Sequence, residues 1–115
     1  MMEECLFCKI IQKKIPAEIV FENGQVLCFR DINPQAPVHI LIIPKKHIPS
    51  LMNMGAGEGG LLEGLYSAIQ HLAREEGVHS SGFRLVVNNG PAAGQAVSHL
   101  HFHLLGGRTL SWPPG

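Results

Sequence analysis

The chain has 115 residues, 45% of them apolar, which fits a single globular domain with a modest core. Nine Lys and Arg balance nine Asp and Glu, so the basic surplus typical of proteins that bind nucleic acid is missing. The longest apolar stretch, residues 40–43, is far too short to cross a bilayer, and the acidic start of the chain is unlike a signal peptide. We therefore expect one domain over residues 1–115, located in the cytoplasm, without a membrane or nucleic-acid partner.

Sequence patterns in the first half of the chain predict one short helix and three strands. These elements are expected at residues 5–14, 18–22, 25–30 and 38–43. The helix is amphipathic, with Leu6 and Ile10 on its apolar face, and Pro16 is expected to end it. An Asn-Gly pair at residues 23–24 is a strong signal for a hairpin between the first two strands. Pro44 ends the apolar run of the third strand, which we expect to be central in the sheet.

The second half is expected to contain an irregular segment, a long helix and two strands, at residues 50–60, 58–76, 83–88 and 98–105. Leucine and isoleucine recur at helical spacing, which predicts a core-facing stripe made of Leu61, Leu62, Leu65, Ile69 and Leu72. Gly77 fits the C′ position that ends a helix. Together with the hairpin, these elements predict an α+β fold with a mostly antiparallel sheet and helices on one of its faces.

Three histidines alternate with bulky apolar residues in the last predicted strand. In a strand, His99, His101 and His103 point to one face, and the intervening apolar side chains point to the core. Imidazole serves as base, acid, nucleophile or metal ligand near neutral pH. Two kinds of site are therefore open: nucleotidyl or phosphoryl transfer with a histidine nucleophile, and a three-histidine metal site with an open position for water. The spacing alone does not choose between them.

Other residues suit a phosphate or a nucleotide. The turn at residues 90–95 is rich in Gly, and its backbone N–H groups are suited to cradle a phosphate, although Gly-Pro turns are common. Asp31 directly follows a predicted strand, where a carboxylate is able to hold ribose hydroxyls, although most loop aspartates are only solvated. His39 is expected to be an inward polar residue with a backbone partner.

At this point the sequence resembles a known family. Residues 99–105 are similar to the His-φ-His-φ-His-φ-φ signature (φ, apolar) of the histidine-triad (HIT) superfamily. The resemblance continues in separate blocks at residues 31–37, 43–47, 87–88 and 94–95. The Trp-Pro-Pro-Gly ending at residues 112–115 is similar to that of the histidine-triad nucleotide-binding (Hint) branch. The blocks agree in order and spacing and cover nearly the whole chain.

The resemblance implies a HIT-like fold with an antiparallel sheet of about five strands and two helices, whose sheet continues across a homodimer. It also implies a purine mononucleotide substrate. Members of this branch hydrolyse adenosine 5′-phosphoramidates, and related acyl-adenylates, to AMP through a covalent nucleotidyl-histidine intermediate. This chemistry requires no cofactor, because the imidazoles supply the positive charge.

By position, the resemblance makes His101 the nucleophile, with His103 and His99 supporting it and the phosphate. Asp31 would hold the ribose, Ile32 would line the base pocket, and the Trp112 tail would reach toward the site of the partner copy. The complete set expected to contact the nucleotide is Asp31, Ile32, Asn88, Gly94, Gln95, Ala96, His101, His103 and Trp112.

Cys5 and Cys8 form a C-x-x-C pair, which is found in redox pairs, in halves of zinc sites and by coincidence. A redox pair belongs in a thioredoxin-like βαβ setting, which is missing here. A structural zinc needs two more ligands, and His47 and His99 are the candidates. Bacterial members of the family with this cysteine pair resemble such a Cys₂His₂ site. The alternative is a pair of reduced cysteines that pack in the core, as expected for Cys28.

One position departs from the family pattern. Many members have Ser after the Gly-Gln pair, where this chain has Ala96, and that hydroxyl is thought to assist the departing amine. We therefore expect slower turnover of substrates with amine leaving groups. Two other functions remain open. One is a zinc hydrolase that uses the three histidines as ligands, and the other is a nucleotide-binding regulatory or scaffold protein with weak catalysis.

Overall fold

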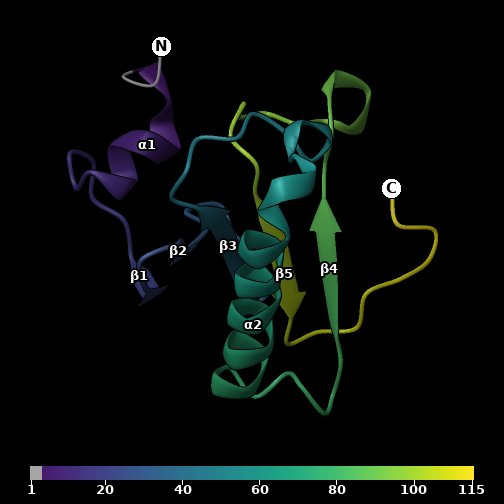
Figure 1. Cartoon of the computed structure of the whole chain (residues 1–115). Helices are drawn as coiled ribbons and strands as arrows, with labels where there is room; N and C mark the ends of the chain where they lie inside the picture. The colour runs from purple at the N-terminus through teal and green to yellow at the C-terminus, as the bar shows by residue number, and fades with distance from the viewer. Residues whose placement is uncertain (1–3) are drawn as a thin grey trace.

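The computed structural model describes residues 4–115. Figure 1 shows a sheet with one long helix, α2, lying across it and a short helix, α1, near the N-terminus. The α-helices are α1 (Leu6–Ile11) and α2 (Gly59–Glu75). The strands are β1 (Ile19–Glu22), β2 (Val26–Arg30), β3 (Val38–Pro44), β4 (Phe83–Val87) and β5 (Phe102–Gly106). Short 3₁₀ helices lie at η2 (Leu51–Asn53), η3 (Ala56–Glu58) and η4 (Pro91–Ala93), so the segment expected to be irregular carries two of them.

The five strands form one sheet in the order β1-β2-β3-β5-β4, and every neighbouring pair is antiparallel. The predicted hairpin is confirmed, because the Asn23 side-chain oxygen accepts the N–H groups of Gln25 and Val26 at 2.9 Å each. The predicted central strand is also confirmed, since all residues of β3 are buried between β2 and β5. The expectation of an α+β fold with an antiparallel sheet is therefore correct.

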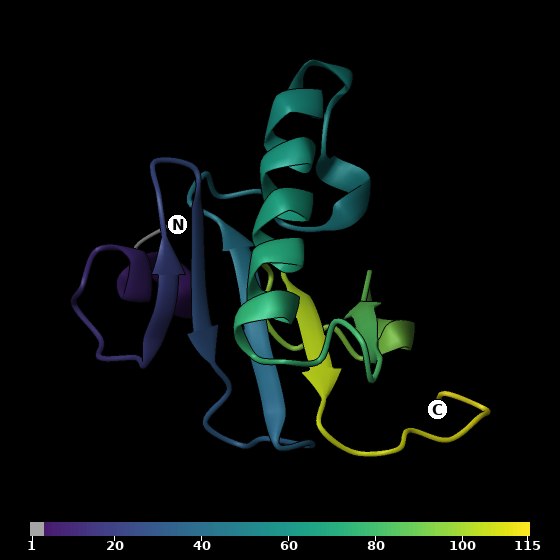
Figure 2. The same ribbon diagram turned by 90° about the horizontal axis from the view of Figure 1, so that it is seen from below.

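Apolar side chains on the two sheet faces form two separate clusters. The α2-side cluster includes Val26, Ile40, Ile42, Leu65, Leu72, Leu100, Phe102 and Leu104. The α1-side cluster consists of Phe7, Ile10, Leu27, Phe29, Leu41 and Ile43, with partly buried residues around it. The prediction that helices cover only one face is thus wrong, and Figure 2 shows α1 and α2 on opposite sides of the sheet. A helix of only six residues gave too weak a pattern to indicate its face.

Helix α1 also differs from its prediction in length and orientation. It ends at Ile11 rather than near Pro16, because Lys13 adopts a left-handed backbone conformation with a φ of 63°. Its buried residues are Phe7, Cys8 and Ile10, whereas Leu6 is 45% exposed. The predicted apolar face is therefore correct for Ile10 and wrong for Leu6.

Helix α2 confirms the predicted long helix and its inward stripe, with Leu65, Ile69 and Leu72 buried. Gly77 follows it with a φ of 72°, as a C′ glycine does. Leu62 was predicted in the stripe but is 47% exposed. The edge strand β4 pairs Leu85 with Leu104 of the α2-side cluster, so Phe83 and Leu85, each 42% exposed, point to the same sheet face as α2.

Strand β5 ends against the loop that follows α2. A Cβ atom on Gly106 would lie 2.9 Å from the Val78 Cγ1 atom, so only glycine fits there without movement of Val78. Gly107 follows with a φ of 87°, which turns the chain out of the sheet. Within residues 4–115, neither helix has both the length and the hydropathy that a membrane span requires.

Candidate functional site

The three alternating histidines lie at the start of β5 and just before it. Strand pairing begins at Phe102, so the predicted strand over residues 98–105 is too long at its N-terminal end. The preceding residues bend away from the sheet, and the Leu100 N–H donates to the Ile48 carbonyl at 2.7 Å. The alternation nevertheless continues through the bend, because Leu100, Phe102 and Leu104 all belong to the α2-side cluster. His99 and His101 are also buried, and they contact Phe7 on the α1 side.

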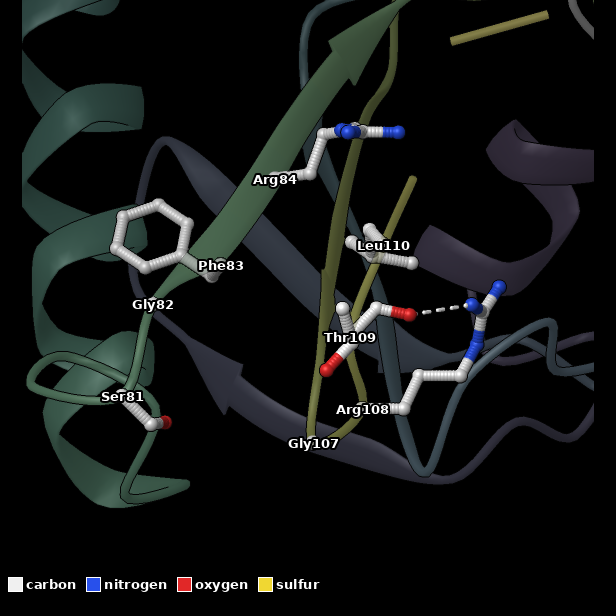
Figure 3. A pocket seen from close by; sticks show the side chains of 8 residues that line it. All are labelled: Ser81, Gly82, Phe83, Arg84, Gly107, Arg108, Thr109 and Leu110. Atoms are coloured by element: carbon white, nitrogen blue, oxygen red, sulfur yellow. Dashed lines mark hydrogen bonds between the residues drawn. The ribbon is translucent and has the colours of Figure 1, made fainter. Parts of the chain in front are cut away.

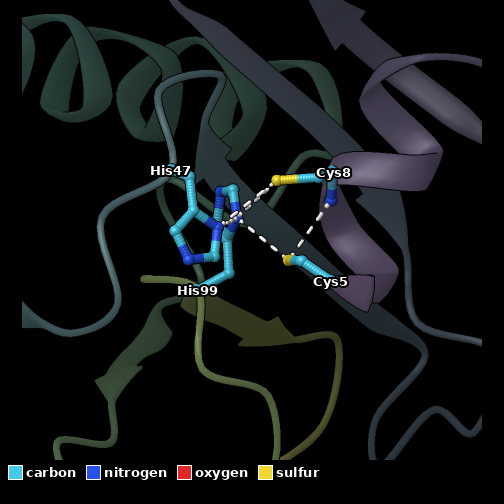
Figure 4. A group of neighbouring side chains, drawn as sticks. All are labelled: Cys5, Cys8, His47 and His99. Carbon is cyan, nitrogen blue, oxygen red and sulfur yellow. Dashed lines mark hydrogen bonds between the residues drawn. The ribbon is translucent and has the colours of Figure 1, made fainter. Parts of the chain in front are cut away.

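His99 is part of a compact group with Cys5, Cys8 and His47, which we call the Cys–His cluster (Figure 4). The His99 Nδ1 atom lies 3.4 Å from the Cys5 Sγ atom, 3.7 Å from the Cys8 Sγ atom and 3.2 Å from the His47 Nδ1 atom. The Cys8 Sγ atom lies 3.3 Å from the His47 Nδ1 atom. The structure therefore brings together all four residues that were expected to hold zinc.

These distances fit a tetrahedral zinc ion. With Zn–S bonds of about 2.3 Å and Zn–N bonds of about 2.0–2.1 Å, tetrahedral geometry requires N···N separations of about 3.3 Å and S···N separations of about 3.5 Å. The observed N···N separation is 3.2 Å, and the S···N separations are 3.3, 3.4 and 3.7 Å. His99 Nε2–H donates to the Pro44 carbonyl at 2.8 Å, which leaves Nδ1 unprotonated and facing the cysteines.

In the metal-free protein, burial shifts the pKa values of two residues of the Cys–His cluster, Cys8 and His99. Burial, and then the neighbouring Cys5, raise the pKa of the Cys8 thiol to about 11. Burial is also the largest cause of the lowered pKa of His99, with His47 and His101 lowering it further. A neutral imidazole is the form that binds metal, and a metal ion would displace the thiol protons.

A second group, the histidine chain, consists of His101, His103, His39 and Asp31. The Gln35 backbone N–H donates to His39 Nδ1 at 3.0 Å, so the proton of a neutral His39 is on Nε2. His39 Nε2–H donates to His103 Nδ1 at 2.9 Å. The remaining ring nitrogen of His103, Nε2, therefore carries a proton and is a donor.

His101 has the opposite tautomer. Its Nδ1–H donates to the His99 backbone carbonyl at 2.7 Å, so Nε2 carries the free lone pair. Within residues 4–115, no group forms a hydrogen bond with that Nε2 atom. The ring centres of His101 and His103 are 5.1 Å apart. An unprotonated nitrogen and a protonated nitrogen thus belong to neighbouring imidazoles, which is an arrangement that suits attack on a phosphorus beside a donor to its oxygens.

Burial favours the neutral imidazoles of His39 and His103. Burial first, and then the nearby His101 and His39, lower the pKa of His103 to about 4, whereas Asp31 opposes the shift. Burial also lowers the pKa of His39, against the opposing charge of Asp31, whose Oδ2 atom lies 3.5 Å from His39 Nε2. The tautomers of His39 and His103 therefore persist at neutral pH.

Asp31, the residue expected at the ribose, belongs to the histidine chain, and Ile32, expected at the base, follows it directly. Asp31 Oδ1 accepts the Asn33 N–H at 2.8 Å, which fixes the carboxylate next to His39. Ile32 is 98% exposed, so its side chain is free to contact a ligand. Asn88 follows β4 and is half-buried. Contact between these residues and a nucleotide stays a prediction.

Several backbone donors of the turn over residues 90–95 are bonded within the loop. The N–H groups of Gly94 and Gln95 donate to the carbonyls of Pro91 and Gly90 at 3.0 and 3.1 Å. The Gln95 side chain accepts the Gly90 N–H and donates to the carbonyls of Pro49 and Val97. Gln95 thus holds the loop together, and contact between this turn and a phosphate stays a prediction.

Two further expected residues are exposed. Ala96 lines a cavity of about 400 Å³ together with residues that include Cys5, His47 and Ser98. Trp112 is 80% exposed, and the Arg84 guanidinium carbon lies 5.9 Å from the centre of its ring. The reach of the Trp112 tail toward a partner copy stays a prediction.

A larger cavity of about 570 Å³ lies between the start of β4 and the residues that follow β5 (Figure 3). Its lining residues are Ser81, Gly82, Phe83, Arg84, Gly107, Arg108, Thr109 and Leu110. Arg108 donates to the carbonyl of Thr109 at 3.0 Å. No histidine, cysteine or carboxylate lines this cavity, so we assign the chemistry to the histidine chain instead.

The structure also separates the three histidines chemically. His99 joins the Cys–His cluster, whereas His103 joins His39 and Asp31, and His101 belongs to neither potential metal-ligand group among the described residues. A three-histidine metal site, one of the two alternatives from spacing, is therefore not supported. Sequence reasoning missed the bond from His39 to His103, although it predicted an inward His39 with a backbone partner, which the Gln35 N–H supplies.

Comparison with known proteins agrees with this geometry. The sequence profile of a family described as "HIT domain" matches residues 12–110. An uncharacterized HIT-like protein of Synechococcus elongatus is 52% identical over 115 residues, which cover 100% of each chain. The crystal structure of a HIT family hydrolase from Legionella pneumophila has a TM-score of 0.95 and 51% identity, covering 97% of this chain and 100% of that one. A histidine triad nucleotide-binding protein from Candida albicans has a TM-score of 0.83 and 33% identity, with 96% and 83% covered.

Proposed function

This chain belongs to the HIT domain family, and we propose that it is a purine nucleotide-binding phosphoramidase. It hydrolyses adenosine 5′-phosphoramidates, and related acyl-adenylates, to AMP through a covalent nucleotidyl-histidine intermediate. The observation that carries this proposal is the 2.7 Å bond from His101 Nδ1–H to the His99 carbonyl, which leaves Nε2 as a free nucleophile. The names of two similar structures, a HIT family hydrolase and a histidine triad nucleotide-binding protein, support the same class of activity.

In the first step, the Nε2 lone pair of His101 attacks the α-phosphorus and forms a phosphorus–nitrogen bond. The bond between phosphorus and the substrate amine breaks, and the amine leaves with the bonding electrons and takes up a proton from solvent water. His101 is then cationic, and the His99 carbonyl stabilises the proton on the His101 Nδ1 atom. In the second step, water attacks the same phosphorus and gives up a proton to solvent, which releases AMP and restores neutral His101.

The rest of the histidine chain supports this step electrostatically. The Gln35 N–H and His39 together present a protonated Nε2 on His103, which donates to a non-bridging phosphate oxygen. Asp31 holds the ribose hydroxyls beside it, and the exposed Ile32 contacts the base. Since the imidazoles supply the donors, this chemistry needs no catalytic metal.

We also propose that the Cys–His cluster binds one structural zinc ion through Cys5, Cys8, His47 and His99. When bound, zinc would tie helix α1 to the segment just before β5, which includes the nucleophile, and would supply no reacting group. The tetrahedral fit of the four ligand atoms supports this assignment. A reducing compartment such as the cytoplasm, where thiols persist, fits the free thiols of the three cysteines.

A homodimer that continues the sheet through β4 is our proposal for the assembly. Strand β4 is an edge strand, and its Phe83 and Leu85 side chains are each 42% exposed. Leu62 and Tyr66 on α2, 47% and 58% exposed, lie on the same side of the sheet. A second copy that covers this apolar edge would bury it from water.

Intact-protein mass spectrometry after rapid mixing with an adenosine 5′-phosphoramidate tests the proposed activity, with His101→Ala measured in parallel. We expect a transient adduct of one AMP on the wild-type protein alone, together with free AMP. Nucleotide binding without adduct or AMP would instead indicate a binding protein, for which the missing hydroxyl at Ala96 is the leading reason. Release of AMP without an adduct, abolished by a chelator, would indicate a zinc hydrolase.

A further inference from the structure

Helix α1 contacts the imidazole of the nucleophile directly. The Phe7 ring lies at 90° to the His101 ring, with 5.1 Å between the ring centres. It also lies at 71° to the His99 ring, with a separation of 5.9 Å. Edge-to-face pairs of this kind are favourable and restrict the rotation of both rings. Phe7 is only 4% exposed and belongs to the α1-side cluster, so its ring is itself held in place beside His101.

Helix α1 is also linked to His101 indirectly, through contacts of its cysteines with His99. Cys5 and Cys8 flank Phe7 in sequence, and their sulfur atoms lie 3.4 and 3.7 Å from His99 Nδ1. His99 in turn provides the backbone carbonyl that accepts the His101 Nδ1–H at 2.7 Å. The tautomer and the orientation of the nucleophile thus depend on the position of His99, and His99 is tied to α1.

Helix α1 depends on these contacts for its own position. It has six residues, far fewer than the roughly 12–15 that an isolated helix needs to be stable in water. Its first turn is capped by the Cys5 thiol, which accepts the Cys8 N–H at 3.4 Å. The cysteine that caps the helix therefore also belongs to the Cys–His cluster, so the ligands and the helix are ordered together.

We propose that Phe7 is a positioning residue for His101, and that the metal-loaded Cys–His cluster fixes the His99 carbonyl that holds the nucleophilic tautomer. This inference rests on the proposed role of His101 as the nucleophile. Rotation of the imidazole displaces Nε2 from the phosphorus, and a misplacement of about 1 Å costs roughly 100-fold in rate. The cluster thereby acts on the chemical step, through residues that do not touch the substrate phosphorus.

The first test measures the rate constant of AMP-adduct formation in single turnovers at saturating adenosine 5′-phosphoramidate. Saturation removes any effect on affinity. We expect Phe7→Leu, which keeps an apolar side chain but removes the ring edge, to lower this rate constant about 10-fold. The matched control is Leu27→Ala, a fully buried position in the same α1-side cluster, which should change it less than twofold. An equal effect of both substitutions, or no effect of Phe7→Leu, would overturn the role of Phe7.

The second test observes the His101 ring directly, by NMR of protein with ¹⁵N-labelled histidine. Zinc-loaded wild-type protein should show one set of His101 signals with the proton on Nδ1. Metal-free wild-type protein and zinc-loaded Phe7→Leu should show both tautomers or exchange broadening, whereas Leu27→Ala should match the wild type. Unchanged His101 signals in the metal-free protein would overturn the role of the cluster.

The two tests also separate this inference from the proposed function. If the wild-type protein forms no adduct, the proposed function fails, while the NMR spectra still report whether α1 orients His101. The metal-free arm needs no substitution, so it decides the role of the cluster even where Phe7→Leu does not fold.

Discussion

The two faces of the sheet use the same strands for different purposes. The face toward α2 carries a buried cluster whose described members are all apolar, including Ile40 and Leu104. The face toward α1 combines a smaller apolar cluster with the buried His39, His99 and His101. Because side chains alternate along a strand, neighbouring residues in β3 and β5 serve stability and chemistry in turn. We therefore expect a substitution to affect mainly one property, according to the face on which it lies.

The largest expected effect is a contrast between His101 and Leu104, whose side chains lie on opposite faces of the sheet: one substitution should affect activity and the other stability. His101→Gln should lower the phosphoramidase rate about 1,000-fold or more, because it removes the nucleophile, and should change the free energy of unfolding by less than about 1 kcal/mol. Leu104→Ala should instead destabilise the fold by about 2–5 kcal/mol, since Leu104 is completely buried, and leave the rate per folded molecule within about twofold. AMP release and urea denaturation of both variants test the contrast, and a large rate loss in Leu104→Ala would contradict it.

Metal removal should affect both activity and stability. The Cys–His cluster lies on the sheet face toward α1, beside the histidine chain, and we expect its zinc also to stabilise the fold. We expect one zinc ion per chain by elemental analysis. Removal of zinc by a chelator should lower the free energy of unfolding by about 3 kcal/mol, which corresponds to a fall in Tm of about 10 °C. Cys5→Ala should lose the metal and reproduce this fall. A chelator-treated protein with an unchanged Tm would contradict a structural zinc.

The sequence predicted the sheet faces of the last strand well, because alternation of histidines with apolar residues leaves one arrangement with a buried core. For β3 it predicted only a central strand, since an apolar run that is buried on both faces does not distinguish them. It did not predict that His99 and His101 precede the strand, since the bend depends on the bond between the Leu100 N–H and the distant Ile48 carbonyl. The bond from His39 to His103 was missed for a similar reason: 64 positions separate the two residues, and only the register of β3 and β5 brings them together.

Low pH should reduce the free energy of unfolding, because His103 is held as a neutral imidazole in the folded protein. The folded-state pKa of His103 is about 4, below the usual value of 6.5, so the unfolded chain binds a proton more readily. Stability from this group is complete above about pH 6.5 and is lost as the pH falls toward 4, by roughly 2 kcal/mol when solvent screening is allowed for. His103→Gln keeps an acceptor and a donor but cannot titrate, so its free energy of unfolding should fall less over this range. Parallel pH profiles for both proteins would contradict this prediction.

The smallest expected effect concerns the position that departs from the family pattern. Ala96→Ser adds a hydroxyl in an exposed position beside the 400 Å³ cavity and restores the residue that the family resemblance implies assists a departing amine. We expect turnover of an amine-leaving phosphoramidate to rise about 3- to 10-fold, equivalent to about 1 kcal/mol, with AMP affinity unchanged. Turnover that does not rise in Ala96→Ser would rule out the missing hydroxyl as a limit on rate.

The contact between Gly106 and Val78 has a consequence for how this sequence is able to drift over generations. A methyl group at position 106 would lie 2.9 Å from Val78, so a lone change to Ala is selected against. A prior change of Val78 to a smaller residue opens the space, which makes the order of the two substitutions matter. Positions 78 and 106 should therefore covary among descendants of this chain, with the smaller residue at 78 acquired first.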